Sequence, residues 1–444
     1  MVVLMALVAA ALAVGASGPV GMPAAAGQPS ATWCTGANAA GTAVLPTLEP
    51  VLAPYLDGRK GAVPGLAVAV VSPTTVGGPP RIALITCGVT EKNGTDPVTG
   101  STRFEIGSVT KTFTATALAL DVLAGHIDLD HDLQTWVPSP YVVPSTPCSG
   151  PSASITINDL ATHNSGLRDD PANATWSDSM PSGRAAYDET DLWSSFATGW
   201  AKPCDPLLFT PGTAYSYSDW GFGLLGTVLA DKYQPNQPIP PYGPMVADRI
   251  AGPLGMTATE LEGPPYTDMA RPECRTGVSE PCWFDNFNAF AGAGGLVSSV
   301  TDMGTWVSAN VGWAPSSLAP AMAMTHAPHG IGPDCDTCMG LAWEISPESK
   351  HRDLVPFDLL VKNGKTNGST TQVYLAPAAC WGTALMGNDA GIDLSVQGLG
   401  GEVIKALGPT DRCPTAPTSS STSSTSAPAA SVVSQPVVTP AFTG

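Results

Sequence analysis

Apolar residues form short runs near both ends of the chain and a different, helical pattern in its middle. Two apolar runs separated by a turn-rich segment lie in residues 61–89, and two more lie in residues 372–389. Each pair predicts two antiparallel strands. Between Ser101 and about Val311 helical patterns alternate with proline-containing loops, and residues 395–408 predict a closing helix. The pattern predicts an α+β fold in which strands flank a helical middle, and the lack of a fixed-period repeat excludes solenoids and propellers.

One predicted helix of the middle region carries a serine and a lysine on the same face. Residues 108–124 contain no proline and are followed by Gly125, a residue expected just past a helix end. Apolar residues cover most of the circumference of this helix, so we expect protein around it and the root of Lys111 inside the structure. Ser108 and Lys111 are three residues apart and therefore share a face.

This spacing has a chemical and a structural interpretation. A serine hydroxyl becomes a good nucleophile when a base within hydrogen-bond reach takes its proton, and a buried lysine, which has lost proton affinity, can be that base. The alternative is an N-cap serine followed by a surface lysine, which is the commoner reason for this spacing. The pair alone leaves both interpretations open.

The two ends of the chain differ in composition from the part between them. Residues 1–26 begin with an apolar, small-residue stretch and end in three alanines, so we expect a secretory signal peptide cut after Ala26. The first Lys or Arg is Arg59, so the usual positive segment is missing. Residues 414–444 are uncharged and rich in Ser, Thr and Pro, as in a disordered tail. The folded domain is predicted over 34–413, with no integral membrane segment in the mature chain.

Cysteine content and charge bear on the environment and the partners of the chain. Ten cysteines among 444 residues fit an oxidised, secreted protein. Proximity suggests the pairs Cys274–Cys282 and Cys335–Cys338, and the pairing of the other six cysteines stays open. The net charge of −18 argues against nucleic acid and anionic membranes as partners. We expect a monomer.

A metal site is the alternative for part of the cysteine pattern. His326 and His329 precede Cys335 and Cys338 at spacings that a zinc site could use. In an exported chain a local disulfide between the two cysteines is the favoured interpretation. We therefore expect no metal and no other cofactor.

Two further motifs add chemistry to the serine and lysine. Tyr217-Ser218-Asp219 follows a Pro-Gly turn, and Lys362-Asn363-Gly364 leads into a predicted strand. With Ser108 and Lys111 they resemble, in the same order, the three active-site signatures of the serine β-lactamase and penicillin-binding protein superfamily, in its class C β-lactamase and DD-peptidase branch. Three further segments resemble that family: ITINDLATHNSGL from Ile155, IAGPLGMTATEL from Ile250 and AGAGGLVSSVTDMGTW from Ala291. The resemblance spans roughly Pro64 to Leu407.

The resemblance implies both a fold and a set of roles. The fold is an antiparallel sheet packed with helices (about 34–100 and 330–413) plus an all-helical lobe (about 101–330), with the active site between them. Ser108 looks like the acylated nucleophile, Lys111 its proton partner and Tyr217 the group that shuttles protons. The backbone N–H groups of Ser108 and Lys365 are expected to bind the oxyanion. Lys362, Asn363 and Gly364 are expected to contact the substrate.

Electrostatics adds two expectations at this site. Two lysines near Tyr217 are expected to favour its phenolate, so that it can act as a base near neutral pH. Asp219 stands where the family's Tyr-x-Asn signature has an amide. An ionised carboxylate only accepts hydrogen bonds, so we expect Asp219 to pair with Lys111 and to bind a substrate carbonyl poorly.

The function predicted from these residues is that of a secreted serine hydrolase working through an acyl-enzyme. The expected substrates are β-lactams or D-alanyl cell-wall peptides, because Lys362 and Asn363 suit a substrate carboxylate. An esterase or amidase acting on another small acyl substrate is one alternative. A penicillin-binding sensor that does not turn over is the other, and the complete set of Ser108, Lys111 and Tyr217 counts against it.

Overall fold

A computed structural model describes residues 33–413 of the chain, except residues 61, 75–78, 175–185, 236, 238–240, 262–267, 273–286, 316, 334 and 336. The predicted signal peptide, the predicted tail and the predicted Cys274–Cys282 pair lie outside the described residues.

A seven-stranded antiparallel sheet joins the two ends of the chain. In spatial order its strands are β1 (Cys34–Gly36), β3 (Arg81–Gly88), β2 (Gly65–Ser72), β10 (Trp381–Gly387), β9 (Thr370–Ala376), β8 (Leu359–Lys365) and β7 (Glu344–Ser346). The hairpins β2–β3 and β9–β10 are the strand pairs predicted from the apolar runs. They meet at the centre of the sheet, where Leu66 of β2 is opposite Gly387 of β10.

Alternate residues of the central strands enter two different apolar cores. In β2, Ala67, Ala69 and Val71 belong to one core, while Leu66, Val68 and Val70 belong to the other. Helices α1 (Ala39–Leu56) and α12 (Leu399–Leu407) contribute to the second core, and α10 (Val300–Ser308) packs on the opposite face. The closing helix predicted from residues 395–408 is therefore present as α12.

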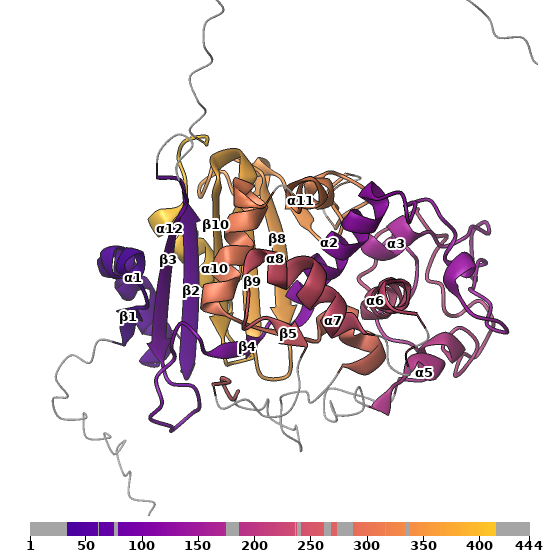
Figure 1. Cartoon of the computed structure of the whole chain (residues 1–444), viewed down its shortest axis with the longest axis horizontal. Coiled ribbons are helices and arrows are strands. Elements are labelled where there is room, and N and C mark those ends of the chain that lie inside the picture. The colour runs from indigo at the N-terminus through magenta and orange to yellow at the C-terminus, as the bar shows by residue number, and fades with distance from the viewer. Residues whose placement is uncertain are drawn as a thin grey trace, which may run out of the picture.

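Besides α2 (Thr110–Leu123), the remaining helices lie mostly to the right of the sheet in Figure 1. They are α3 (Ile157–Ala161), α5 (Glu189–Ser194), α6 (Asp219–Tyr233), α7 (Tyr242–Val246), α8 (Gly252–Leu254), α9 (Ala291–Gly294) and α11 (Ala319–His326). A small sheet, ordered β4 (Arg103–Glu105), β6 (Leu296–Ser299) and β5 (Glu260–Leu261), leads into the site. Tight 3₁₀ turns occur at Gly107–Val109, Leu133–Trp136, Asn288–Phe290, Glu348–Lys350 and Pro377–Ala379, and wider π turns at Ala247–Ala251 and Ala309–Trp313.

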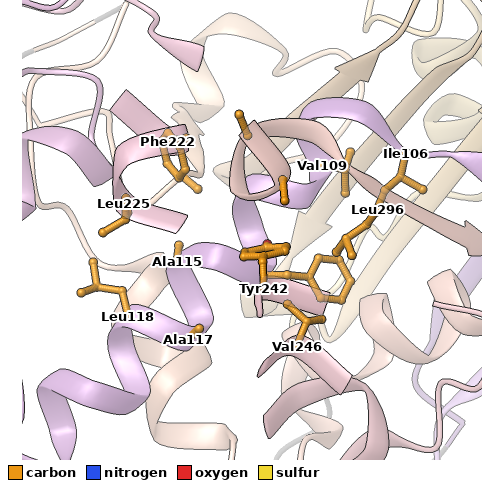
Figure 2. Close-up of a cluster of buried hydrophobic side chains, with 14 of the residues drawn as sticks. Ile106, Val109, Ala115, Ala117, Leu118, Phe222, Leu225, Tyr242, Val246 and Leu296 are labelled. Carbon is orange, nitrogen blue, oxygen red and sulfur yellow. The ribbon is translucent and has the colours of Figure 1, made fainter. Parts of the chain in front are cut away.

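Helix α2 is surrounded by protein, as its apolar circumference predicts. Ala115 and Leu118 lie near Phe222 and Leu225 of α6, and Tyr242 of α7 packs nearby (Figure 2). All of these side chains are buried. The helix therefore has a fixed place in the molecule, which fixes the direction of the side chains at its N-terminus.

Four disulfides cross-link the described part of the chain: Cys34–Cys87, Cys148–Cys204, Cys335–Cys338 and Cys380–Cys413. The second predicted local pair, Cys335–Cys338, is thus a disulfide, while His326 bonds to Asn310 and His329 to the carbonyl of Met324. No helix among the described residues is both long and apolar enough to span a bilayer.

Candidate active site

Ser108 lies in the 3₁₀ turn Gly107–Val109, directly before α2 rather than as its first residue. Gly107 has a φ of +49°, and a Cβ atom on it would lie 2.7 Å from the amide nitrogen of Lys365. A Cβ on Gly364 would lie 1.9 Å from the carbonyl oxygen of Ile106. Both glycines are required, because only bare backbone allows the end of β8 to pack against the serine turn.

Two side chains donate hydrogen bonds to the Ser108 hydroxyl oxygen. Lys111 Nζ lies 2.9 Å from Ser108 Oγ, and the Tyr217 hydroxyl lies 2.6 Å from it. Lys111 comes from the next turn of the same helical segment, and Tyr217 from the loop before α6. The structure thus brings together the three residues that the sequence singles out for covalent chemistry.

Lys111 is a buried ammonium group with acceptors for its three N–H bonds. Its side chain is 0% exposed, and besides Ser108 Oγ it donates to Asp219 Oδ1 and to the Ala293 carbonyl, both at 2.6 Å. The predicted ion pair between Asp219 and Lys111 is therefore present. As the ammonium partner of Asp219, Lys111 donates to Ser108 and has no lone pair with which to accept a proton.

The surroundings of Tyr217 favour its neutral phenol, contrary to the phenolate expected from the sequence. Lys111 Nζ and Lys362 Nζ lie 5.0 and 5.3 Å from the centre of its ring, as expected. Burial nevertheless raises the pKa of Tyr217 well above its usual value, and the negative charge of Asp219 raises it further. Tyr217 is half-buried, and desolvation of its phenolate is the largest influence on this pKa.

Lys362 is itself affected by burial. It is 5% exposed, and its Nζ donates to the carbonyl oxygen of Asn363 at 2.8 Å. Burial, with Lys111 as the second cause, lowers the pKa of Lys362 to about 7. Its cationic charge is thus partial near neutral pH, which is a second reason why the phenolate is not favoured.

The rest of the substrate-binding motif lies on β8 past the end of β7. Strand β7 pairs with β8 from Leu359 to Val361, and Lys362–Lys365 continue beyond it toward the serine turn. Asn363 and Lys365 are exposed, whereas Gly364 is buried against Ile106. Four of the predicted substrate-binding residues, Lys362–Lys365, therefore lie within one short segment beside Ser108, and the fifth, Asp219, begins α6.

Comparison with known proteins identifies the family. The family model described as Beta-lactamase matches residues 48–399. The chain belongs to the beta-lactamase family. Members of this family are serine hydrolases that act on small substrates.

Relatives with known names and structures agree with this assignment. A beta-lactamase of Pseudomonas fluorescens is 25% identical over 335 residues, which are 74% of this chain and 78% of that protein. A solved class C beta-lactamase has a TM-score of 0.64 at 22% identity, covering 83% of this chain and 97% of that one. The beta-lactamase/D-alanine carboxypeptidase of Pseudomonas syringae has a TM-score of 0.62 at 22% identity, covering 82% and 97%. The predicted fold, an antiparallel sheet packed with helices, is confirmed.

Two further side chains of this beta-lactamase family member support the site and were given no role from sequence. Glu105 is 1% exposed, and its carboxylate accepts a hydrogen bond from the hydroxyl of Thr366, the residue after Lys365. The Thr366 hydroxyl in turn accepts from the Ser369 N–H at 3.0 Å. This contact ties the segment that leads into Ser108 to the end of β8.

His163 is the second such residue, and its ring packs on the ring of Tyr217 with 4.4 Å between centroids. It belongs to the ITINDLATHNSGL segment, whose resemblance to the family was the available signal. The resemblance points to the segment as a whole and not to His163 itself. The contact between His163 and Tyr217 joins residues 54 positions apart and depends on the tertiary fold.

Proposed function

We propose that the protein is a secreted serine hydrolase that forms an acyl-enzyme through Ser108 and acts on a β-lactam or a D-alanyl cell-wall peptide. The observation that carries this proposal is the convergence of Lys111 Nζ and the Tyr217 hydroxyl on Ser108 Oγ, at 2.9 and 2.6 Å. Export is supported by the four disulfides, which form in oxidising compartments.

In acylation, Ser108 Oγ attacks the substrate carbonyl carbon while its proton leaves. Because Tyr217 is neutral, we propose that it relays this proton. The hydroxyl of Ser108 turns to donate to the phenol oxygen, and the phenol gives its own proton to the leaving nitrogen or oxygen. Lys111, held in its charged form by Asp219 at 2.6 Å, stabilises the negative charge that develops on Oγ. In deacylation a water molecule takes the place of the leaving group and attacks the acyl carbon. It gives a proton to the Tyr217 oxygen, and the Tyr217 hydroxyl returns a proton to Ser108 Oγ.

The carbonyl oxygen of the substrate becomes an oxyanion in this step. The proposed donors are the backbone N–H groups of Ser108 and Lys365. The close approach of Gly107 to Lys365 supports this pairing. Donors of this kind are effective because they are already in place when the charge develops, and the loss of one typically lowers kcat by about a hundredfold or more.

Substrate recognition is proposed to involve the carboxylate that both β-lactams and peptide C-termini carry. Lys362 supplies a cation and Asn363 an exposed amide beside it. A carboxylate brought against Lys362 stabilises its charged form, so binding is expected to raise the lowered pKa again. The names of the relatives, a beta-lactamase and a beta-lactamase/D-alanine carboxypeptidase, support this substrate class.

Asp219 favours the second candidate function, an esterase or amidase acting on another small acyl substrate. Its carboxylate is paired with Lys111 and cannot donate to the amide side chain of a typical penicillin or cephalosporin. A small ester has no amide side chain and therefore needs no hydrogen bond from this position. A sensor that is acylated without turnover is disfavoured by the complete relay around Ser108.

The experiment that separates these functions is intact-mass analysis with a panel of β-lactams, run beside turnover of nitrocefin and p-nitrophenyl esters. A transient acyl adduct together with turnover is expected in the natural protein, and neither in Ser108→Ala, because the bond-forming oxygen is gone. A melting curve of the variant serves as the control for folding. An adduct that persists in Ser108→Ala would reject Ser108 as the nucleophile, and a stable adduct without turnover would support the sensor.

A further inference from the structure

His163 contacts Tyr217 and its two neighbours in sequence in three ways. Its ring packs on the Tyr217 ring at an interplanar angle of 30°. Its Nδ1 accepts the N–H of Ser218 at 3.1 Å, and its carbonyl oxygen accepts the N–H of Ser216 at 2.9 Å. One residue thus holds the backbone on both sides of Tyr217 and the face of its ring.

The hydrogen bond from Ser218 fixes the protonation state of this imidazole. Nδ1 is an acceptor, so the ring is neutral and its proton is on Nε2. His163 is 1% exposed, and burial, together with the charges of Lys111 and Lys362, lowers its pKa well below the usual value. Nε2 has no hydrogen-bond partner within the part of the chain that the structure describes. A buried N–H without a hydrogen-bond partner lowers the stability of the fold. A contribution to stability therefore does not explain why a histidine occupies this position.

Ordinary core packing does not account for a histidine here. Its backbone has a φ of +59°, in the left-handed region that non-glycine residues enter rarely, although histidine enters it more often than most of them. Asparagine or glycine also fits that region, and phenylalanine fills the same space without a buried N–H. Histidine is the residue that combines a flat ring for Tyr217 with an acceptor for Ser218.

We propose that His163 is a positioning residue that holds the Tyr217 hydroxyl on Ser108 Oγ. The proposal rests on the function proposed above, in which Tyr217 relays the proton. The hydroxyl lies 2.6 Å from Oγ, and a displacement of about 1 Å in such a contact can lower a rate roughly a hundredfold. His163 contacts the ring and the flanking backbone of Tyr217, so its effect on catalysis passes through that tyrosine.

The test uses two substitutions that each remove one half of the contact. His163→Phe keeps an aromatic ring and loses the acceptor, whereas His163→Asn keeps an acceptor close to the place of Nδ1, tolerates the left-handed backbone and loses the ring. His351→Asn is the matched control. His351 is also buried, at 5% exposed, and bonds to Ser346 and to the carbonyl of Phe357.

Each variant is measured alone and combined with Tyr217→Phe. We expect His163→Phe to lower kcat at least tenfold with KM changed less than threefold, and His163→Asn to recover part of the loss. In the Tyr217→Phe background His163→Phe is expected to have almost no further effect, because the hydroxyl that it positions is absent. His351→Asn is expected to lower the melting temperature and to leave kcat unchanged in both backgrounds.

An equal loss from His163→Phe with and without the Tyr217 hydroxyl overturns the proposal, because His163 then acts independently of that group. A crystal structure of His163→Phe supplies a readout that needs no substrate. The distance from the residue 217 hydroxyl to Ser108 Oγ is expected to exceed 3.5 Å, and an unchanged distance of 2.6 Å also overturns the proposal. If the natural protein turns over no substrate at all, the proposed function fails, while the crystal structure still decides whether His163 positions Tyr217.

Discussion

At the scale of single residues, Asp219 is the main departure from the family's active-site signature. Its carboxylate accepts a hydrogen bond from Lys111 at 2.6 Å and, unlike the amide of an asparagine, has no N–H to offer a substrate carbonyl. The pair also keeps Lys111 charged and thereby limits it to donating toward Ser108 Oγ. In the proposed function, the choice of substrate and the activation of the serine therefore both depend on this position.

Asp219→Asn is expected to raise kcat/KM selectively for β-lactams that carry an amide side chain. An asparagine can donate to that side chain and still accept from Lys111. A gain of about tenfold, which corresponds to about 1.4 kcal/mol, relative to a simple p-nitrophenyl ester would fit one restored hydrogen bond. The comparison of the two substrates in the same variant is the control. An equal change on both would show that Asp219 acts on Ser108 and Lys111 alone.

Lys362 predicts a pH dependence that separates substrates with and without a carboxylate. A lysine carries its charge below its pKa, and burial together with Lys111 lowers the pKa of Lys362 to about 7. The charge is therefore lost as the pH rises through about 7. We expect the ratio of kcat/KM for a carboxylate-bearing β-lactam to that for a neutral ester to fall about tenfold between pH 6 and pH 8.

Lys362→Arg provides the control for this profile, because a guanidinium stays charged over that range. The arginine variant is expected to lose the pH dependence of the ratio, even if its absolute rates are lower. A flat ratio in the natural protein would contradict the assignment of Lys362 as the carboxylate-binding group.

At the scale of elements, the turn before α2 and the end of β8 form one unit. Gly107 and Gly364 allow the close approach, and the hydrogen bond from Thr366 to Glu105 holds the two segments together. The proposed oxyanion donors, the N–H groups of Ser108 and Lys365, belong to residues directly next to Gly107 and Gly364 in the chain. Their separation is thus set by the packing of one element on another.

Thr366→Val removes the hydroxyl of this contact and keeps the shape of the side chain. We expect kcat to fall about tenfold or more, because a loosened oxyanion donor loses part of its stabilisation of the transition state. Thr366→Ser keeps the hydroxyl and is expected to retain most of the rate. Thr383→Val is the matched control: Thr383 is 0% exposed and donates to the Ala69 carbonyl at 2.8 Å between the central strands β10 and β2. A similar loss of kcat in both valine variants would indicate general destabilisation.

The elements also show what could be predicted from sequence. Strands β2, β3, β9 and β10 and helix α2 have long apolar runs, so local patterns were sufficient. Strand β1 was not predicted because it has three residues and is held by pairing with β3 and by the Cys34–Cys87 disulfide, both of which are long-range contacts. The helix start was placed two residues early, because the left-handed backbone of Gly107 sets Ser108 in a separate 3₁₀ turn.

In the candidate site, too, local motifs could be predicted from sequence and long-range contacts could not. Ser108, Lys111, Tyr217 and Lys362 could be found because their motifs are local in sequence. The neutral state of Tyr217 and the contact with His163 could not be found in that way, because both depend on which groups the tertiary fold buries around the tyrosine. Sequence therefore points to the groups that are proposed to react, whereas the surroundings that set their protonation states follow from packing.

At the scale of the whole molecule, the disulfides close loops of very different length. Cys34–Cys87 spans 53 residues and joins β1 to β3, whereas Cys335–Cys338 spans 3. A cross-link stabilises the native state mainly by lowering the entropy of the unfolded chain, and this effect grows with the length of the closed loop. Replacing each pair of cysteines by serines is therefore expected to lower the free energy of unfolding by different amounts.

We expect the double replacement Cys34→Ser and Cys87→Ser to lower the free energy of unfolding by about 4 kcal/mol, and Cys335→Ser with Cys338→Ser by about 1.6 kcal/mol, on the loop-entropy relation. Urea titrations of the natural protein and both variants measure the difference, and nitrocefin or ester turnover at low denaturant reports whether the site survives. Each double variant removes one bond and leaves no unpaired cysteine from it, so the pairs are matched in chemistry. Equal losses in the two variants would mean that local packing around the sulfur atoms, rather than loop closure, determines what these bonds contribute.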